Sequence, residues 1–138
     1  MQMSTYLTFK GECGAALTLY ERSLGGILGP LFRYAGTELA NKVPADWQDK
    51  IMRGSITIGG QVLIGPDITP DKFEVPKGFS LSLQFTALKG PSASFTTWRR
   101  GTVVMPLEKT FWAARFGVVV DRLGIQWLIN CDGSEQTP

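Results

Sequence analysis

The sequence contains no histidine. Histidine is the commonest metal ligand in proteins, and it is the one side chain whose unperturbed pKa lies close to neutral pH. Its absence excludes a Ser-His-Asp triad, a Cys-His pair, a mixed-ligand zinc site and a two-histidine, one-carboxylate iron site. The sequence also lacks a phosphate-binding glycine loop and a dinucleotide fingerprint. We therefore expect no metal and no cofactor, and any catalysis would use carboxylate, lysine, tyrosine or thiol groups.

Cysteine, net charge and long apolar runs are scarce as well. Cys13 and Cys131 stand near opposite ends of the chain without metal-binding spacing, so we expect two reduced, buried thiols. The net charge is only +2, and no basic cluster exceeds Arg99-Arg100, which argues against nucleic acid as a partner. No apolar run reaches the roughly 18 residues that a membrane span needs, and no secretory pattern opens the chain. These features predict a cytoplasmic protein with no membrane partner.

What is present is the composition of an ordinary folded domain, with 138 residues, 43% of them hydrophobic and 19% charged. Alternating and helical apolar spacings predict a single α+β domain over residues 1–138. A helix is expected from residue 13 to residue 24, ended by Gly25-Gly26. The expected strands cover residues 5–9, 27–34, 51–58, 61–64, 79–85, 102–105, 113–120 and 125–130.

A weak internal repeat organises these elements. Leu7-Thr8-Phe9 is matched further along by Leu83-Gln84-Phe85, and Gly25 by Gly101 at the same offset. The order strand, helix-sized segment, three strands thus occurs twice. We predict two tandem βαβββ modules that form curved mixed sheets, the first at about residues 1–66 and the second at about residues 78–131.

The segment 91–100 occupies the expected place of the second helix, yet it is rich in serine and threonine, which are poor helix formers. It could be a weak version of that helix. Alternatively, a compensated pair of frameshifts could have replaced the native helix, because GC-rich codons for this segment encode an amphipathic helix when read one base earlier. The nucleotide sequence distinguishes these two explanations.

Several motifs carry a family resemblance, among them Phe111-Trp112, Arg115-Phe116-Gly117, and the Asp-x-x-Gly-x-x-Trp run that starts at Asp121. In collinear order over nearly the whole chain, the sequence resembles the PhnB-like branch of the vicinal oxygen chelate superfamily. That superfamily includes glyoxalases, bleomycin-resistance proteins and extradiol dioxygenases. The resemblance implies that each curved sheet forms a cup for a small-molecule ligand. It also implies a homodimer in which half-cups complete each other.

The resemblance also locates where a metal would bind, and the residues there are unsuitable. Metal-using members carry His or Gln on the first strand of a module and Glu on its last strand. Here the last-strand position falls on Leu128, an apolar side chain that cannot bind a divalent cation. Arg53 stands where related sequences often carry a histidine. The metal site of the superfamily is therefore not expected in this chain.

The candidate ligand-binding residues come from both modules. An arginine flanked by aromatic residues suits a planar or anionic ligand, so Arg115 is the expected anchor, with Trp112 and Trp127 as walls. The two tryptophans could equally be core, with Arg115 paired to a carboxylate. A polar strand face could supply orienting hydrogen bonds or simply face water. That face consists of Ser80, Ser82 and Gln84. Tyr6 could point into the cup or belong to the core.

These features favour a metal-free, small-molecule-binding protein, and two alternatives stay open. One is an isomerase or lyase that uses Arg115 with a carboxylate such as Glu108 or Asp121. The other is a resistance protein that sequesters an aromatic drug without turnover. A shared fold cannot decide among them, because one scaffold hosts many functions.

Overall fold

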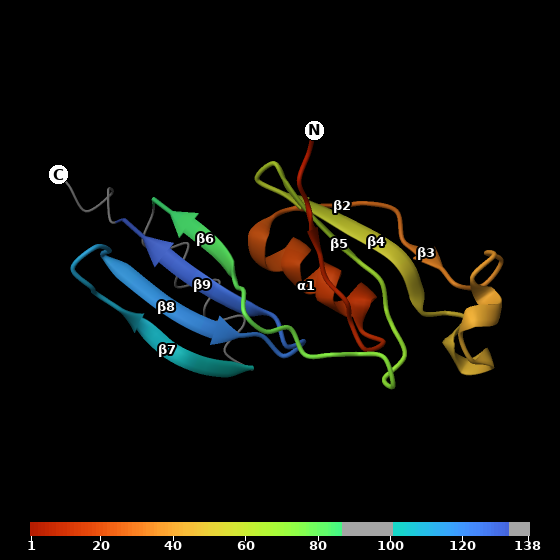
Figure 1. Cartoon of the computed structure of the whole chain (residues 1–138). Coiled ribbons are helices and arrows are strands. Elements are labelled where there is room, and N and C mark those ends of the chain that lie inside the picture. Colours follow the sequence, from red (N-terminus) through yellow and green to blue (C-terminus); the bar gives the residue numbers. More distant parts are fainter. Residues whose placement is uncertain (87–100, 133–138) are drawn as a thin grey trace. The chain divides into compact units, whose positions relative to one another are not determined.

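The computed structural model describes residues 1–86 and 101–132 of the chain (Figure 1). The chain divides into two compact units, unit 1 at Met1–Glu74 and unit 2 at Val75–Pro138. Each unit is built on one mixed β-sheet, which confirms the predicted α+β class. The segment 91–100, with its two proposed explanations, lies outside the described residues. In the described part of the chain, no helix is long and apolar enough to cross a membrane.

Unit 1 consists of a helix and a five-stranded sheet in the order β1-β5-β4-β2, with β3 also paired to β4. Strand β1 runs parallel to β5, and the other pairs are antiparallel. Two short 3-10 helices, η1 and η2, lie in the loop predicted at residues 35–49. The elements are β1 (Thr5–Tyr6), α1 (Cys13–Leu24), β2 (Ile27–Leu28), β3 (Phe32–Arg33), η1 (Ala40–Lys42), η2 (Ala45–Trp47), β4 (Ile51–Ile58) and β5 (Gln61–Gly65).

Two predicted strands of unit 1 are shorter in the structure. The strand expected at 27–34 is split into β2 and β3 around Gly29 and Pro30, because proline has no N–H to donate to a ladder. The strand expected at 5–9 ends at Tyr6, and Phe9 makes only an isolated parallel bridge to Asp67. Both corrections arise where the apolar pattern continues but the regular pairing does not.

Helix α1 has the predicted bounds because its apolar spacing and its end signal agree. Its buried residues, Cys13, Ala16, Leu17 and Tyr20, form one face. Gly25 ends the helix in the left-handed conformation at φ 71°, and its N–H bonds to the Glu21 carbonyl. The helix packs against β4, where a Cβ on Gly54 would lie 2.9 Å from the Leu17 side chain. Glycine there allows the close approach of helix and sheet.

Unit 2 holds a four-stranded sheet in the order β6-β9-β8-β7, with β6 parallel to β9. Strand β8 begins two residues later than predicted, because Thr110 and Ala113 close a hydrogen-bonded turn just before it. Strand β7 continues past Met105, with register shifts around Pro106. The strands are β6 (Leu81–Phe85), β7 (Thr102–Glu108), β8 (Arg115–Val120) and β9 (Gln126–Cys131).

The predicted turn between β8 and β9 is confirmed and is organised by Asp121. The carboxylate of this buried residue accepts hydrogen bonds from the backbone N–H groups of Leu123 at 2.9 Å and Ile125 at 3.1 Å. It also accepts the indole N–H of Trp127 at 2.9 Å. Gly124 adopts φ 91°, which suits glycine at the end of the turn. Asp121 therefore joins the turn to the core of its unit.

Candidate functional site

One face of the unit 1 sheet is covered by α1, and the other is not. Directly paired residues share a sheet face, and residues alternate along each strand. The register therefore assigns to the uncovered face the residues Tyr6, Ile27, Phe32, Arg53, Ser55, Thr57, Val62 and Ile64. Ile27 is 75% exposed, Tyr6 64% and Phe32 51%. We call this surface the unit 1 open face, and large exposed apolar side chains of this kind mark binding surfaces.

The sheet of unit 2 has two unlike faces as well. Trp127, Ile129 and Cys131 of β9 are buried, whereas the alternate residues of β9 and the polar residues of β6 share the opposite face. We call that opposite side the unit 2 open face. It carries the predicted polar side chains, of which Ser82 and Gln84 are exposed. By strand pairing the face includes Ser82, Gln84, Glu108, Phe116, Val118, Val120, Gln126, Leu128 and Asn130, of which Val118 is buried.

Two amide side chains that the sequence reasoning missed complete this polar row. The Gln126 amide donates to the Ser80 hydroxyl at 2.7 Å, and the Asn130 amide donates to the Gln84 carbonyl at 2.7 Å. The Asn130 Oδ1 atom is buried and accepts no hydrogen bond from the residues that the structure describes. The alternation of Gln126 and Asn130 with the buried Trp127 was the available sequence signal.

An aromatic cluster borders the unit 2 open face. Phe116 pairs with Asn130 and so shares that face. The Trp112 ring meets Phe116 edge to face, with centroids 5.3 Å apart, and Phe111 contacts Trp112 at 4.8 Å. Trp112 remains 52% exposed and Phe111 97%. Exposed aromatic rings beside paired amides can bind a flat organic molecule by stacking and hydrogen bonding.

Arg115 and Trp127 lie apart from this cluster. Arg115 is exposed at the first residue of β8 and pairs with Cys131, so strand alternation places it on the face opposite Phe116. Trp127 is 2% exposed, and its indole N–H donates a hydrogen bond to Asp121. It lies four residues along β9 from Cys131, the partner of Arg115, which is a separation of roughly 13 Å. The structure therefore does not bring Arg115, Trp112 and Trp127 together around one ligand.

The two carboxylates considered as catalytic partners of Arg115 are also separated from it. Glu108 pairs with Phe116 and belongs to the unit 2 open face, whereas Arg115 points to the other side. Asp121 lies six residues beyond Arg115 in the chain, roughly 20 Å along the strand direction. Its oxygens are already bonded to three donors of its own turn. No Arg115–carboxylate centre forms with either residue.

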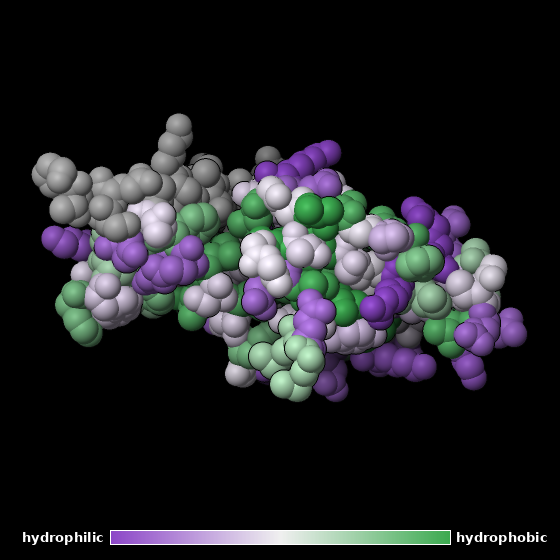
Figure 2. Space-filling view, turned by 90° about the horizontal axis from the view of Figure 1, so that it is seen from above, coloured by the Kyte–Doolittle hydropathy of each residue, from purple (hydrophilic) through white to green (hydrophobic). Residues whose placement is uncertain are grey.

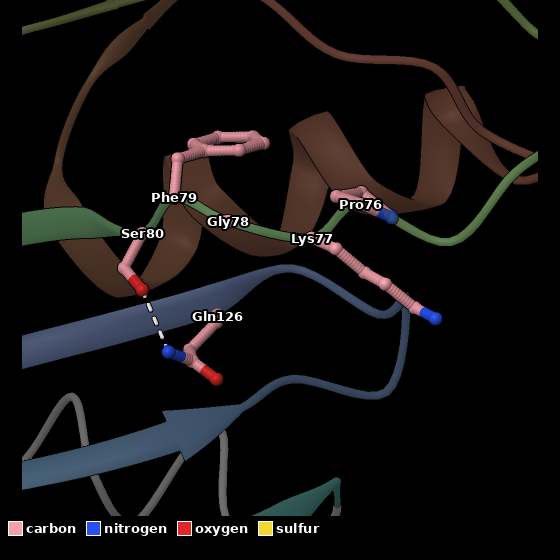
Figure 3. A pocket seen from close by; sticks show the side chains of 6 residues that line it. All are labelled: Pro76, Lys77, Gly78, Phe79, Ser80 and Gln126. Carbon is pink, nitrogen blue, oxygen red and sulfur yellow. Dashed lines mark hydrogen bonds between the residues drawn. The ribbon is translucent and has the colours of Figure 1, made fainter.

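A pocket of about 400 Å³ opens at the start of β6. Ser80 and Gln126 point toward one another across it, and the Phe79 ring points to the other side of the chain (Figure 3). Lys77 contributes an exposed ammonium group. The pocket is lined by Pro76, Lys77, Gly78, Phe79, Ser80 and Gln126. It extends the polar row at the end of the strand and can accept a polar group.

The metal-binding positions implied by the superfamily carry residues that do not fit a divalent cation. Strand pairing places Leu128 beside Ser82 and Asn130 beside Gln84 on the unit 2 open face. These are one apolar and three neutral side chains, without the carboxylate or imidazole that such a site needs. Among the described residues, no three His, Cys, Asp or Glu side chains gather as a metal site would require.

Unit 1 contains a buried carboxylate that sequence reasoning did not single out. Asp67, 1% exposed, accepts the backbone N–H of Cys13 at 2.7 Å and that of Ile51 at 3.0 Å. The Tyr34 hydroxyl donates to its backbone carbonyl at 2.6 Å. Burial raises the pKa of the Asp67 carboxyl, and backbone hydrogen bonds from Ile51, Cys13 and Gly11 oppose that shift, as does the charge of Lys50. Asp67 thus joins the start of α1 to β4, and it is remote in sequence from both partners.

The thiol of Cys13 lies in the same buried region. Burial, and to a lesser extent the charge of Asp67, raises its pKa to about 12. A thiol with such a pKa stays protonated near neutral pH and is a poor nucleophile. Cys13 and Cys131 are both buried and free, which accords with the predicted reduced thiols and gives no sign of thiol catalysis.

Comparisons with known proteins show the family. No protein-family model matches the chain. Protein YjdN of Escherichia coli strain K12 is 30% identical over 141 residues, a match that covers 94% of this chain and 95% of YjdN. The crystal structure of protein PA1353 from Pseudomonas aeruginosa is 36% identical, with a TM-score of 0.85 and coverage of 96% and 98%.

More distant structures share the fold. The PhnB protein from Bacillus cereus is 19% identical, with a TM-score of 0.82, and the match covers 95% of this chain and 99% of that one. A glyoxylase/bleomycin resistance protein/dioxygenase domain from Frankia sp. EAN1pec is 11% identical, with a TM-score of 0.66 and coverage of 96% and 97%. The fold is that of the vicinal oxygen chelate superfamily. Within it, the chain belongs to the PhnB-like branch.

Proposed function

We propose that the protein binds a small organic molecule, without a metal or cofactor, on the open faces of its sheets. The observation that supports this proposal is the exposure of large aromatic side chains beside polar groups on, or at the border of, the two open faces. Tyr6 and Phe32 stand on the unit 1 open face, and Trp112 borders the unit 2 open face. Leaving such side chains in water costs stability that burial against a ligand would recover.

The residues of the proposed site divide by role. On the unit 2 open face, Ser82 and Gln84 provide hydrogen bonds, and the Ser80–Gln126 pair extends them into the pocket at the start of β6. Trp112 provides a stacking wall there, and Tyr6 provides one on the unit 1 open face. Arg115 and Trp127, on the other side of the unit 2 sheet, are not part of this site. The space-filling view shows hydrophobic surface, in green, among surface of intermediate hydropathy, in white, and hydrophilic surface, in purple (Figure 2).

The test is a screen of aromatic small molecules that follows the tryptophan fluorescence of the purified protein. We expect saturable binding, and Trp112→Ala or Gln84→Ala should weaken it by about tenfold, which corresponds to roughly 1.4 kcal/mol. Arg122→Ala, at an exposed position in the turn after β8, is the control and should leave binding unchanged. Absence of any saturable ligand, or equal affinity of all variants, would count against the proposal.

The alternative is binding followed by turnover, and the ligands found in the screen distinguish the two possibilities. The binding proposal expects each ligand to be recovered unchanged after incubation in large excess over protein. Consumption of a ligand beyond one equivalent would favour the isomerase or lyase alternative. Stoichiometric protection against an aromatic drug without its consumption would favour sequestration.

We also propose that the protein works as a homodimer in the cytoplasm. Exposed Ile27, Val103 and Val104 are apolar surface that a second copy could cover, and the free cysteines suit a reducing compartment. Light scattering coupled to size exclusion should give twice the 15.1 kDa chain mass. A monomer at micromolar concentration would contradict the dimer.

A further inference from the structure

The unit 1 open face carries a single charged side chain among the residues that the register assigns to it, all of which the structure describes. That residue is Arg53 of β4. It is exposed, and no hydrogen bond or ion pair holds its guanidinium within the described part of the chain. An arginine with free donors, set on an otherwise neutral surface, is available for an anionic group from outside the unit.

Aromatic side chains flank Arg53 on the same face. Phe32 is its direct partner across the β3–β4 pair, and such partners have Cβ atoms about 5 Å apart. Tyr6 pairs with Ile64, which in turn pairs with Ser55, two residues from Arg53 on β4. At roughly 4.8 Å between strands and 3.3 Å between residues, the Cα atoms of Tyr6 and Arg53 lie about 12 Å apart. The floor between them is Ile64 and Ser55.

We propose that Arg53 binds the anionic group of an aromatic ligand whose ring system lies on Ile64 between Tyr6 and Phe32. The inference rests on the proposed function, because it names the ligand class for one of the open faces. A guanidinium can bind a carboxylate, sulfonate or phosphate through two parallel hydrogen bonds. The neighbouring rings exclude water from one side of that contact, which strengthens it. The site therefore selects aromatic anions over neutral aromatic molecules of the same size.

A matched pair of fluorescent probes tests this selectivity. 8-Anilinonaphthalene-1-sulfonate is anionic, and N-phenyl-1-naphthylamine has the same ring system without the sulfonate. The variant Arg53→Met keeps much of the side-chain length and removes the charge. Arg33→Met is the control, because Arg33 pairs with Ile51, a buried residue whose side chain lies beside Gly14 of α1, on the face opposite the unit 1 open face. Circular dichroism and thermal melts establish that each variant is folded.

The expected result is that Arg53→Met weakens binding of the sulfonate probe by about tenfold or more and changes binding of the neutral probe by less than about twofold. Arg33→Met should change neither. Equal binding of the sulfonate probe by wild type and Arg53→Met overturns the inference, and so does an equal loss of both probes. If Tyr6→Ala and Phe32→Ala still weaken both probes in those cases, the proposed function survives without Arg53 as anchor. If neither probe binds the folded wild type, both fail.

Discussion

Removing the Asp121 carboxylate should destabilise the protein severely. The carboxylate is buried and accepts hydrogen bonds from Leu123, Ile125 and the Trp127 indole. In Asp121→Ala, the Leu123 N–H can turn to water, because it is only part-buried. The other two donors are buried, and each buried donor left without a partner costs about 1–3 kcal/mol. The free energy of unfolding should therefore fall by about 2–6 kcal/mol.

Urea denaturation followed by tryptophan fluorescence and circular dichroism measures this loss. Trp127→Phe is the matched variant, because it removes one donor and leaves the carboxylate with the other two. A double-mutant cycle between the two changes should give a coupling of about 1.5–3 kcal/mol, the range for a hydrogen bond to a charged group.

A loss below about 0.5 kcal/mol, as for a surface substitution, would refute the reasoning. It would mean that the turn does not depend on Asp121. If an activity were found and Asp121→Ala abolished it without loss of stability, the residue would instead be catalytic.

Three further outcomes are expected. Because burial raises the pKa of Asp67 above its unfolded value of about 3.9, the folded state binds that proton more tightly. The contribution of Asp67 to the free energy of unfolding is then fully present below about pH 3.9 and declines as pH rises through the raised pKa. In urea denaturation, the free energy of unfolding of the wild type should therefore fall relative to that of Asp67→Asn between these two pH values. Parallel pH profiles of the two proteins would contradict this. Cys13 and Cys131 should react with a thiol reagent at pH 8 only after unfolding, and rapid labelling of the native protein would contradict their burial. Elemental analysis after dialysis against a chelator should find no stoichiometric transition metal, since Leu128 occupies the carboxylate position; about one Zn, Ni, Fe or Mn per chain would overturn that expectation.

Local sequence signals determined much of this fold. Helix α1 could be predicted to the residue because Gly25 ends an apolar period of helical spacing. The β4–β5 hairpin followed from Gly59-Gly60, whose φ values of 53° and 81° suit the tight turns that join twisted strands. Asp121 and Gly124 likewise marked the turn before β9. In each case the residues that specify the helix or turn are neighbours in the chain, so the local sequence is sufficient to predict it.

The composition of the candidate site was decided by tertiary structure. Because side chains alternate along a strand, the point at which pairing starts sets which face each one joins. Arg115 and Phe116 are adjacent and so point to opposite faces, and the register with β9 decided that Arg115 joins the face of Cys131 and Phe116 that of Asn130.

Hydrogen-bond partners that are remote in sequence could not be predicted from the sequence either. Gln84 meets Asn130 across 46 residues, and Asp67 meets Cys13 across 54. The absence of histidine, a fact of the sequence alone, was enough to exclude the common metal chemistries. Which of the remaining side chains share a face of a sheet depended on register, because register is set by long-range pairing that no local pattern records.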